Sequence, residues 1–235
     1  MGRLDKDGGG RSVWAGKETY DMKFRSIVVG ACALTASIAF ADTTPVMVSL
    51  VTPVQAPSRS YDVTGLRLSF IYGDCREFTG LDLGVIQRTA DAFTGVALGG
   101  VNIAGGRMLG GQVGLVNWSG DTAPAWHLRS TGVQFGLVNY AGAFCGLQSS
   151  LANITGGAFA GLQDGVFNCA DDMYGVQCGL YFLFGVNIAY GNVRGCQIGL
   201  VNFAETMDSG LQIGLLNIIG NNGWLPVLPI VNGHF

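Results

Sequence analysis

The chain has 235 residues, of which 12% are charged and 38 are glycine, and its formal net charge is −3. So low a charge density argues against disorder, and so much glycine argues against an ordinary helical domain. From Asp42 onward the chain has seven arginines, no lysine and twelve acidic residues, which excludes the basic surface that nucleic-acid binding requires.

The N-terminal segment predicts export. Two basic residues follow Met22, an apolar run occupies 26–40, and a small-x-small cleavage site precedes Asp42. The sequence therefore predicts a signal peptide over 22–41 and a location in the cell envelope, the outer membrane or the cell surface. We expect the polar, glycine-rich residues 1–21 to be a disordered leader or a misassigned start.

Cleavage before Asp42 would remove Cys32 and leave five cysteines. This is an odd number, and no pair has Cys-x-x-Cys spacing, so the sequence predicts neither a complete disulfide framework nor a zinc site. We expect these cysteines to be small apolar fillers, and we expect no metal and no cofactor.

Residues 42–64 contain three prolines around the apolar run 46–51. Proline lacks the backbone donor that a central strand needs, so a strand here belongs at a sheet edge. We expect 42–64 to be an N-terminal capping strand.

Residues 65–224 form a repeat domain whose phrase is clearest at 132–139, Gly-Val-Gln-Phe-Gly-Leu-Val-Asn. Steps between successive leading glycines are 15, 15, 15, 22, 14, 15, 14, 20 and 15 residues. A unit of this length is too short for a helical hairpin. The leading glycines are Gly65, Gly80, Gly95, Gly110, Gly132, Gly146, Gly161, Gly175, Gly195 and Gly210.

Residues alternate with period two inside each unit, which is typical of strands. With the leading glycine as position 0, odd positions hold apolar residues and then Asn, as at Val133, Phe135, Leu137 and Asn139. Even positions hold Gly, Gln and Gly. We expect the odd positions to form the core and the glutamines to be exposed.

Two closed arrangements would pair such strands at both edges. In a parallel β-solenoid each unit of about 15 residues is one coil, so that like residues stack and buried Asn forms an amide ladder. The predicted structural ladder comprises Asn102, Asn117, Asn139, Asn153, Asn168, Asn202, Asn217 and Asn232. About eleven coils at about 4.8 Å each would extend about 50 Å.

The alternative is an antiparallel outer-membrane β-barrel with one strand per repeat. The terminal aromatic residue Phe235 favours it. However, successive barrel strands run up and down, so a period of one strand would place identical residues in opposite environments. We therefore expect an all-β fold in the form of a parallel β-solenoid.

Residues 225–235 keep an Asn fifteen residues after Asn217 but carry two prolines, so we expect a C-terminal capping repeat. Both long steps indicate insertions, one around 118–130 and the other including the partial copy 185–189. Trp126 and His127 in the first insertion are a candidate loop contact.

The opening Pro45–Leu50, the Gly-x-Gln-x-Gly-Leu-x-Asn phrases and the closing Leu225–Asn232 resemble a family of bacterial surface-repeat proteins. The resemblance covers 45–235, and the sequence departs from the pattern at Ser149–Ser150, Asp164 and Phe182. It implies a cell-envelope protein of diderm bacteria and no particular activity.

No nucleophile and base are paired in the sequence, so we predict no catalytic residues and a chain that is not an enzyme. We expect an exported cell-surface repeat protein with a structural or adhesive role in the bacterial envelope, whose partner is the outer membrane or a surface ligand. A small outer-membrane β-barrel or pore is the alternative.

Overall fold

The computed structural model describes residues 43–120, 130–179 and 184–235 and is all β. Within these ranges no helix is long and apolar enough to cross a membrane. The predicted leader and signal peptide, and Trp126 and His127, lie outside the described residues. The strands are β1 Thr43–Val51, β2 Val54–Ala56, β3 Asp62–Cys75, β4 Phe78–Thr89, β5 Phe93–Ala104, β6 Met108–Val113, β7 Val116–Ser119, β8 Ser130–Phe135, β9 Val138–Ala141, β10 Phe144–Thr155, β11 Phe159–Ala170, β12 Met173–Gly179, β13 Val186–Ile198, β14 Val201–Asn221 and β15 Val227–His234.

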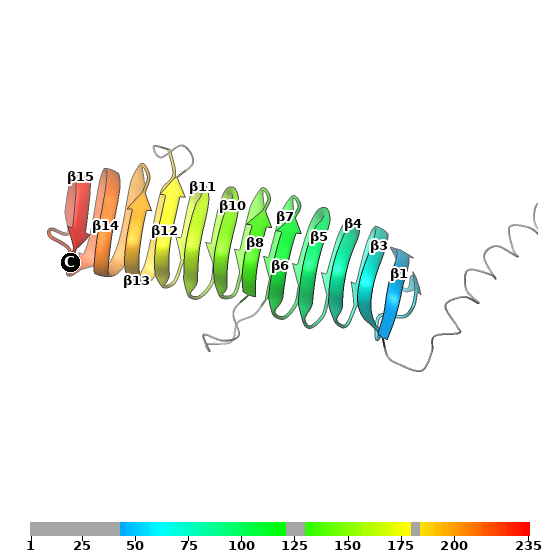
Figure 1. The fold of residues 1–235 in the computed structure, drawn as a ribbon. Coiled ribbons are helices and arrows are strands. Elements are labelled where there is room, and N and C mark those ends of the chain that lie inside the picture. Colours follow the sequence, from blue (N-terminus) through cyan, green and yellow to red (C-terminus); the bar gives the residue numbers. More distant parts are fainter. Residues whose placement is uncertain (1–42, 121–129, 180–183) are drawn as a thin grey trace, which may run out of the picture. The chain divides into compact units, whose positions relative to one another are not determined.

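Parallel pairing of successive units builds the fold (Figure 1). In β10 and β11, for example, Gly146 pairs with Gly161, Gln148 with Gln163, and so on in the register of the repeat. The units form a β-solenoid of about 11 turns. The predicted solenoid is confirmed, and the alternative fold, an antiparallel barrel, is wrong.

Each coil consists of two straight limbs joined by a bend at positions 4 and 5. In the coil of β6 and β7 the bend is Gly114–Leu115, and in the coil of β8 and β9 it is Gly136–Leu137. A short turn then leads from the second limb to the next coil. Positions 5 and 6 both face outward at the bend, so the inward-facing positions are even in the first limb and odd in the second.

This change of parity corrects the predicted core. Gln134 at position 2 and Asn139 at position 7 are both fully buried, whereas Phe135 is 42% and Leu137 49% exposed. The glutamines therefore face the interior, and the apolar residues of the repeat face outward. The prediction was wrong because it extended one alternation through the bend.

The apolar core lies on the turn side of the coils. Large residues at position −2 include Phe144 and Phe159, whose rings stack 6.1 Å apart. They pack opposite small residues at position 9, such as Ala141 and Ala170. Beside the bend, the interior is filled by the amide side chains instead.

Different strands close the two ends of the stack. At one end β2 pairs antiparallel with β1, which lies parallel to β3. At the other end β15, which contains Pro229, pairs antiparallel with β14. Both terminal strands carry or adjoin prolines that withhold a backbone donor from further pairing.

Both long steps contain less insertion than the sequence indicated. Val186–Ala189 pairs in register with Phe167–Ala170, so the partial copy of the phrase is the second limb of its own coil. The extra residues precede it. In the first long step, Val116–Ser119 likewise belongs to the stack as β7.

Candidate functional site: amide ladders and an apolar exterior

An Asn ladder runs through the second limbs at position 7. Each Nδ2 donates to the Oδ1 of the Asn in the following coil, at 2.8 to 3.0 Å. The same Nδ2 also donates to a backbone carbonyl beside the next bend, as from Asn117 to Phe135 at 2.8 Å. The Asn ladder comprises Asn102, Asn117, Asn139, Asn153, Asn168, Asn187, Asn202 and Asn217.

Two residues differ from the predicted set. Asn187 belongs to the ladder but was missed, because the insertion before it breaks the period of fifteen. Asn232 is not a member, because antiparallel β15 places it opposite Gln212, and its Nδ2 donates to the Leu225 carbonyl. Its spacing from Asn217 matched the repeat, but its strand runs the other way.

A Gln ladder runs through the first limbs at position 2, and its side chains are buried instead of exposed as predicted. Here each Nε2 donates to the Oε1 of the Gln in the preceding coil, at 2.7 to 2.9 Å. The two ladders therefore point in opposite directions along the stack. The Gln ladder comprises Gln112, Gln134, Gln148, Gln163, Gln177, Gln197 and Gln212.

The ends of the ladders follow from these directions. Asn102 begins the Asn ladder, and its buried Oδ1 accepts no hydrogen bond within the described structure. The buried Oε1 of Gln212, the last residue of the Gln ladder, likewise accepts none. Glycine at the bend leaves room for the amides, since a Cβ on Gly114 would lie 2.6 Å from Asn102 Nδ2. The ladders are fully enclosed and offer no ligand site.

In the first coils other residues replace the amides. Arg67 and Asp82 occupy position 2 in β3 and β4, where they form a buried ion pair. Ala97 occupies position 2 in β5, and Gln87 occupies position 7 in β4, where later coils carry Asn. Gln87 Nε2 donates to the Leu98 carbonyl at 3.0 Å, as the Asn side chains of later coils donate to a backbone carbonyl beside the next bend.

Cys75 adjoins this ion pair and is fully buried. Arg67 Nη1 lies 2.9 Å from its Sγ. Burial raises the pKa of the Cys75 thiol to about 11, against the opposing effect of the guanidinium. The thiol is therefore protonated at neutral pH and is a poor nucleophile. In the described ranges the cysteines form no disulfide bond, and no group of three or more His, Cys, Asp or Glu side chains could hold a metal ion.

Exposed apolar side chains recur at the bend of eight coils; position 5 is Gly100 in the coil of β5 and lies outside the described residues in the coil of β12. At position 5, where each coil bends, large apolar side chains are 39–69% exposed. We call this column the bend ridge. It comprises Phe70, Val85, Leu115, Leu137, Leu151, Val166, Leu200 and Leu215.

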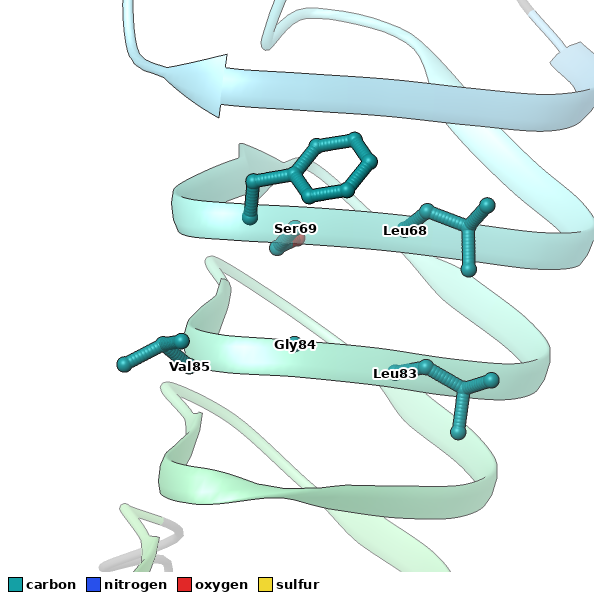
Figure 2. A pocket seen from close by; sticks show the side chains of 6 residues that line it. Leu68, Ser69, Leu83, Gly84 and Val85 are labelled. Atoms are coloured by element: carbon teal, nitrogen blue, oxygen red, sulfur yellow. The ribbon is translucent and has the colours of Figure 1, made fainter.

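Figure 2 shows the ridge at the first two coils. Leu68 and Leu83 lie one above the other on the first limb, and Val85 projects at the bend. Together with Phe70 they line a shallow apolar pocket. Ser69, the polar residue of the lining, is 1% exposed and is turned into the coil, so this pocket has no convergent polar groups.

Charged side chains gather at the opposite edge, on or beside the turns between coils. The described residues of this turn edge include Asp62, Arg76, Glu77, Asp91, Arg107, Asp171, Asp172, Arg194, Glu205 and Asp208. The cross-section of a coil is thus apolar at the bend and charged at the turn. The predicted loop contact, Trp126 and His127, lies outside the described residues.

Comparison of the chain with protein-family models, with curated proteins and with solved structures finds no match. The resemblance to bacterial surface-repeat proteins over 45–235 therefore stays a prediction.

Proposed function

We propose that this chain is an exported, non-enzymatic repeat protein with a structural or adhesive role in the bacterial cell envelope, and that the apolar exterior is its working surface. The observation that carries the proposal is the bend ridge, which recurs in eight coils between Phe70 and Leu215 and is interrupted by Gly100 in the coil of β5. Soluble monomers rarely expose contiguous apolar patches of this extent, and such patches mark interaction surfaces.

The interior supports a structural role. Parallel backbone pairing joins the successive coils, and from the coil of β6 and β7 to that of β14 both amide ladders recur, so these coils are held by their neighbours in the same way. Such a stack presents a long surface of constant chemistry, as repeat architectures do. The predicted signal peptide over 22–41 supports export.

Location and processing test the proposal. The full chain with a C-terminal tag is expressed in a diderm bacterium, followed by cell fractionation and N-terminal sequencing. We expect a mature chain beginning at Asp42 in the envelope fraction. The control variant Ala41→Phe, which blocks the small-x-small site, should keep the leader. An unprocessed wild-type chain in the cytoplasm contradicts the proposal.

A further inference from the structure

The bend ridge is flanked by apolar residues on both limbs. Position 3 of the first limb exposes Leu98, Val113 and Phe135 by 41–44%. Position 6 of the second limb exposes Val138 by 37% and Leu216 by 38%. At positions 5 and 6 the described part of the chain carries no charged residue.

Apolar residues on both sides of the ridge favour an occupant that covers both limbs beside the bend. A second copy packed against one limb, as in a sheet-on-sheet dimer, leaves the ridge and the other limb in water. A lipid leaflet covers the ridge and both flanks at once. Resting on the function proposed above, we propose that the bend ridge inserts into the surface of a lipid bilayer, with the axis of the stack parallel to the membrane plane.

The dimensions of a coil fit insertion to the acyl boundary. Interfacial elements bury their apolar face by about 5–10 Å. With a rise of about 3.3 Å per residue, positions 3 and 6 lie within about 7 Å of the ridge. The charged turn edge, at the far end of both limbs, stays in water.

Aromatic residues lie at the depth expected of lipid headgroups. Trp118 and Tyr140 occupy position 8, about 10 Å from the ridge at the strand rise given above. Their rings stack with centroids 3.9 Å apart, and Trp118 is 42% exposed. Trp and Tyr favour the membrane–water interface, where an apolar ring meets polar headgroups.

Backbone groups at the bend are already paired inside the stack. Leu115 N donates to the Gly100 carbonyl at 2.8 Å, and Leu137 N donates to the Leu115 carbonyl at 3.0 Å. The adjacent Phe135 carbonyl accepts from Asn117. Lipid contact demands that backbone polar groups be satisfied internally, and these groups meet that demand.

One side chain opposes insertion. Asp164 at position 3 is half-buried, and among the described residues it is the one charged group at positions 3, 5 and 6. A carboxylate near the acyl boundary weakens insertion. Its replacement by an apolar residue should therefore strengthen lipid binding, in the direction opposite to polar changes on the ridge.

Flotation of the purified protein with neutral phosphatidylcholine vesicles tests the proposal. The ridge variant is Leu115→Gln, Leu137→Gln and Leu151→Gln, at residues 49–58% exposed. Its matched control is Leu81→Gln, Leu109→Gln and Leu162→Gln, at residues 40–43% exposed on the first limb, away from the bend. Circular dichroism and thermal melting check that each variant is folded.

We expect the wild type to float at low and at high salt, because neutral lipid and an uncharged ridge leave little for salt to screen. The ridge variant should partition at least about tenfold less, and the control should stay within roughly twofold of the wild type. Asp164→Leu should partition more than the wild type.

Three results overturn the proposal: a wild type that does not float, a ridge variant that floats like the wild type, or equal losses in both triple variants. A wild-type dimer that the ridge variant converts to monomer, with neither binding vesicles, assigns the ridge to a second copy. The assay uses purified protein from whichever cell fraction contains it. All variants share the same N-terminus, so a failure of lipid binding is distinguishable from a failure of export.

Discussion

Arg67 and Asp82 lie opposite each other in adjacent coils and form an ion pair in which each side chain is 1% exposed. Arg67 Nε donates to Asp82 Oδ1 at 2.8 Å, and Arg67 Nη1 donates to the Arg88 carbonyl at 2.7 Å. The pair occupies position 2, where later coils carry Gln. At this end of the stack an ion pair therefore stands in place of the Gln ladder.

Removal of one partner should be worse than removal of both. Arg67→Leu or Asp82→Leu alone leaves a buried charge uncompensated, which we expect to lower the free energy of unfolding by about 3–5 kcal/mol. The double variant should lose less than either single variant. Urea denaturation measures all three. The exposed pair of Arg194 and Asp208 is the control, because its removal should leave the midpoint nearly unchanged. A double variant as unstable as the sum of the single variants contradicts this prediction.

An interior member of the Asn ladder should matter more than its first member. Asn153→Ala removes the acceptor of Asn139 Nδ2 and the donor to both Asn168 and the Asp164 carbonyl. Asn102→Ala removes donor bonds alone, because Asn102 Oδ1 accepts none in the described structure. Each buried group left unpaired costs about 1–3 kcal/mol, so Asn153→Ala should shift the urea midpoint further. Equal shifts would show that direction along the ladder has no energetic effect.

The leading glycines should not tolerate a side chain. Gly146 has φ of +135°, and a Cβ there would lie 2.0 Å from the Gly132 carbonyl oxygen. We expect Gly146→Ala to destabilise the chain by more than about 2 kcal/mol, from strain and from the displaced backbone. Gly111→Ala is the matched control, since its Cβ would meet nothing closer than 4.0 Å. Thermal melting should show a large fall for the first and little change for the second; similar falls contradict the prediction.

Cys75 should react with iodoacetamide after unfolding and not before. With a pKa of about 11, roughly one thiol in a thousand is ionised at pH 8, and the side chain is fully buried as well. Half-buried Cys145 serves as the internal reference within the same chain. Peptide mass spectrometry after timed labelling should find Cys145 modified first, and Cys75 modified only with urea present. Equal labelling of both in native buffer contradicts the buried position.

The sequence was sufficient to predict the coil length, the parallel stack and the Asn ladder. These follow from the regular spacing of Gly and Asn, because like residues stack when the period equals one coil. The outward face was not predictable by simple alternation. The chain bends at Gly136–Leu137, where the successive residues Leu137 and Val138 both face outward, and the parity of every later position in the coil changes.

The direction of β15 also could not be predicted from the repeat pattern. Asn232 repeats the spacing of the ladder, yet β15 pairs antiparallel because it closes the stack instead of continuing it. The burial of glutamine was missed for a related reason. A single Gln in a core is unfavourable, and it becomes favourable when neighbouring coils supply both its donor and its acceptor, as for Gln148 between Gln134 and Gln163.

The opposed directions of the Asn and Gln ladders bear on how long such a protein can become. Aligned amides in one column alone would add their dipoles coil by coil, so that partial charge of opposite sign would build up at the two ends. Here one column donates toward the C-terminal coil and the other toward the N-terminal coil, and their axial components largely cancel. Tandem duplication of a fifteen-residue unit therefore lengthens the molecule without an electrostatic penalty from its side-chain amides. The number of units can then change without a growing charge at either end of the stack.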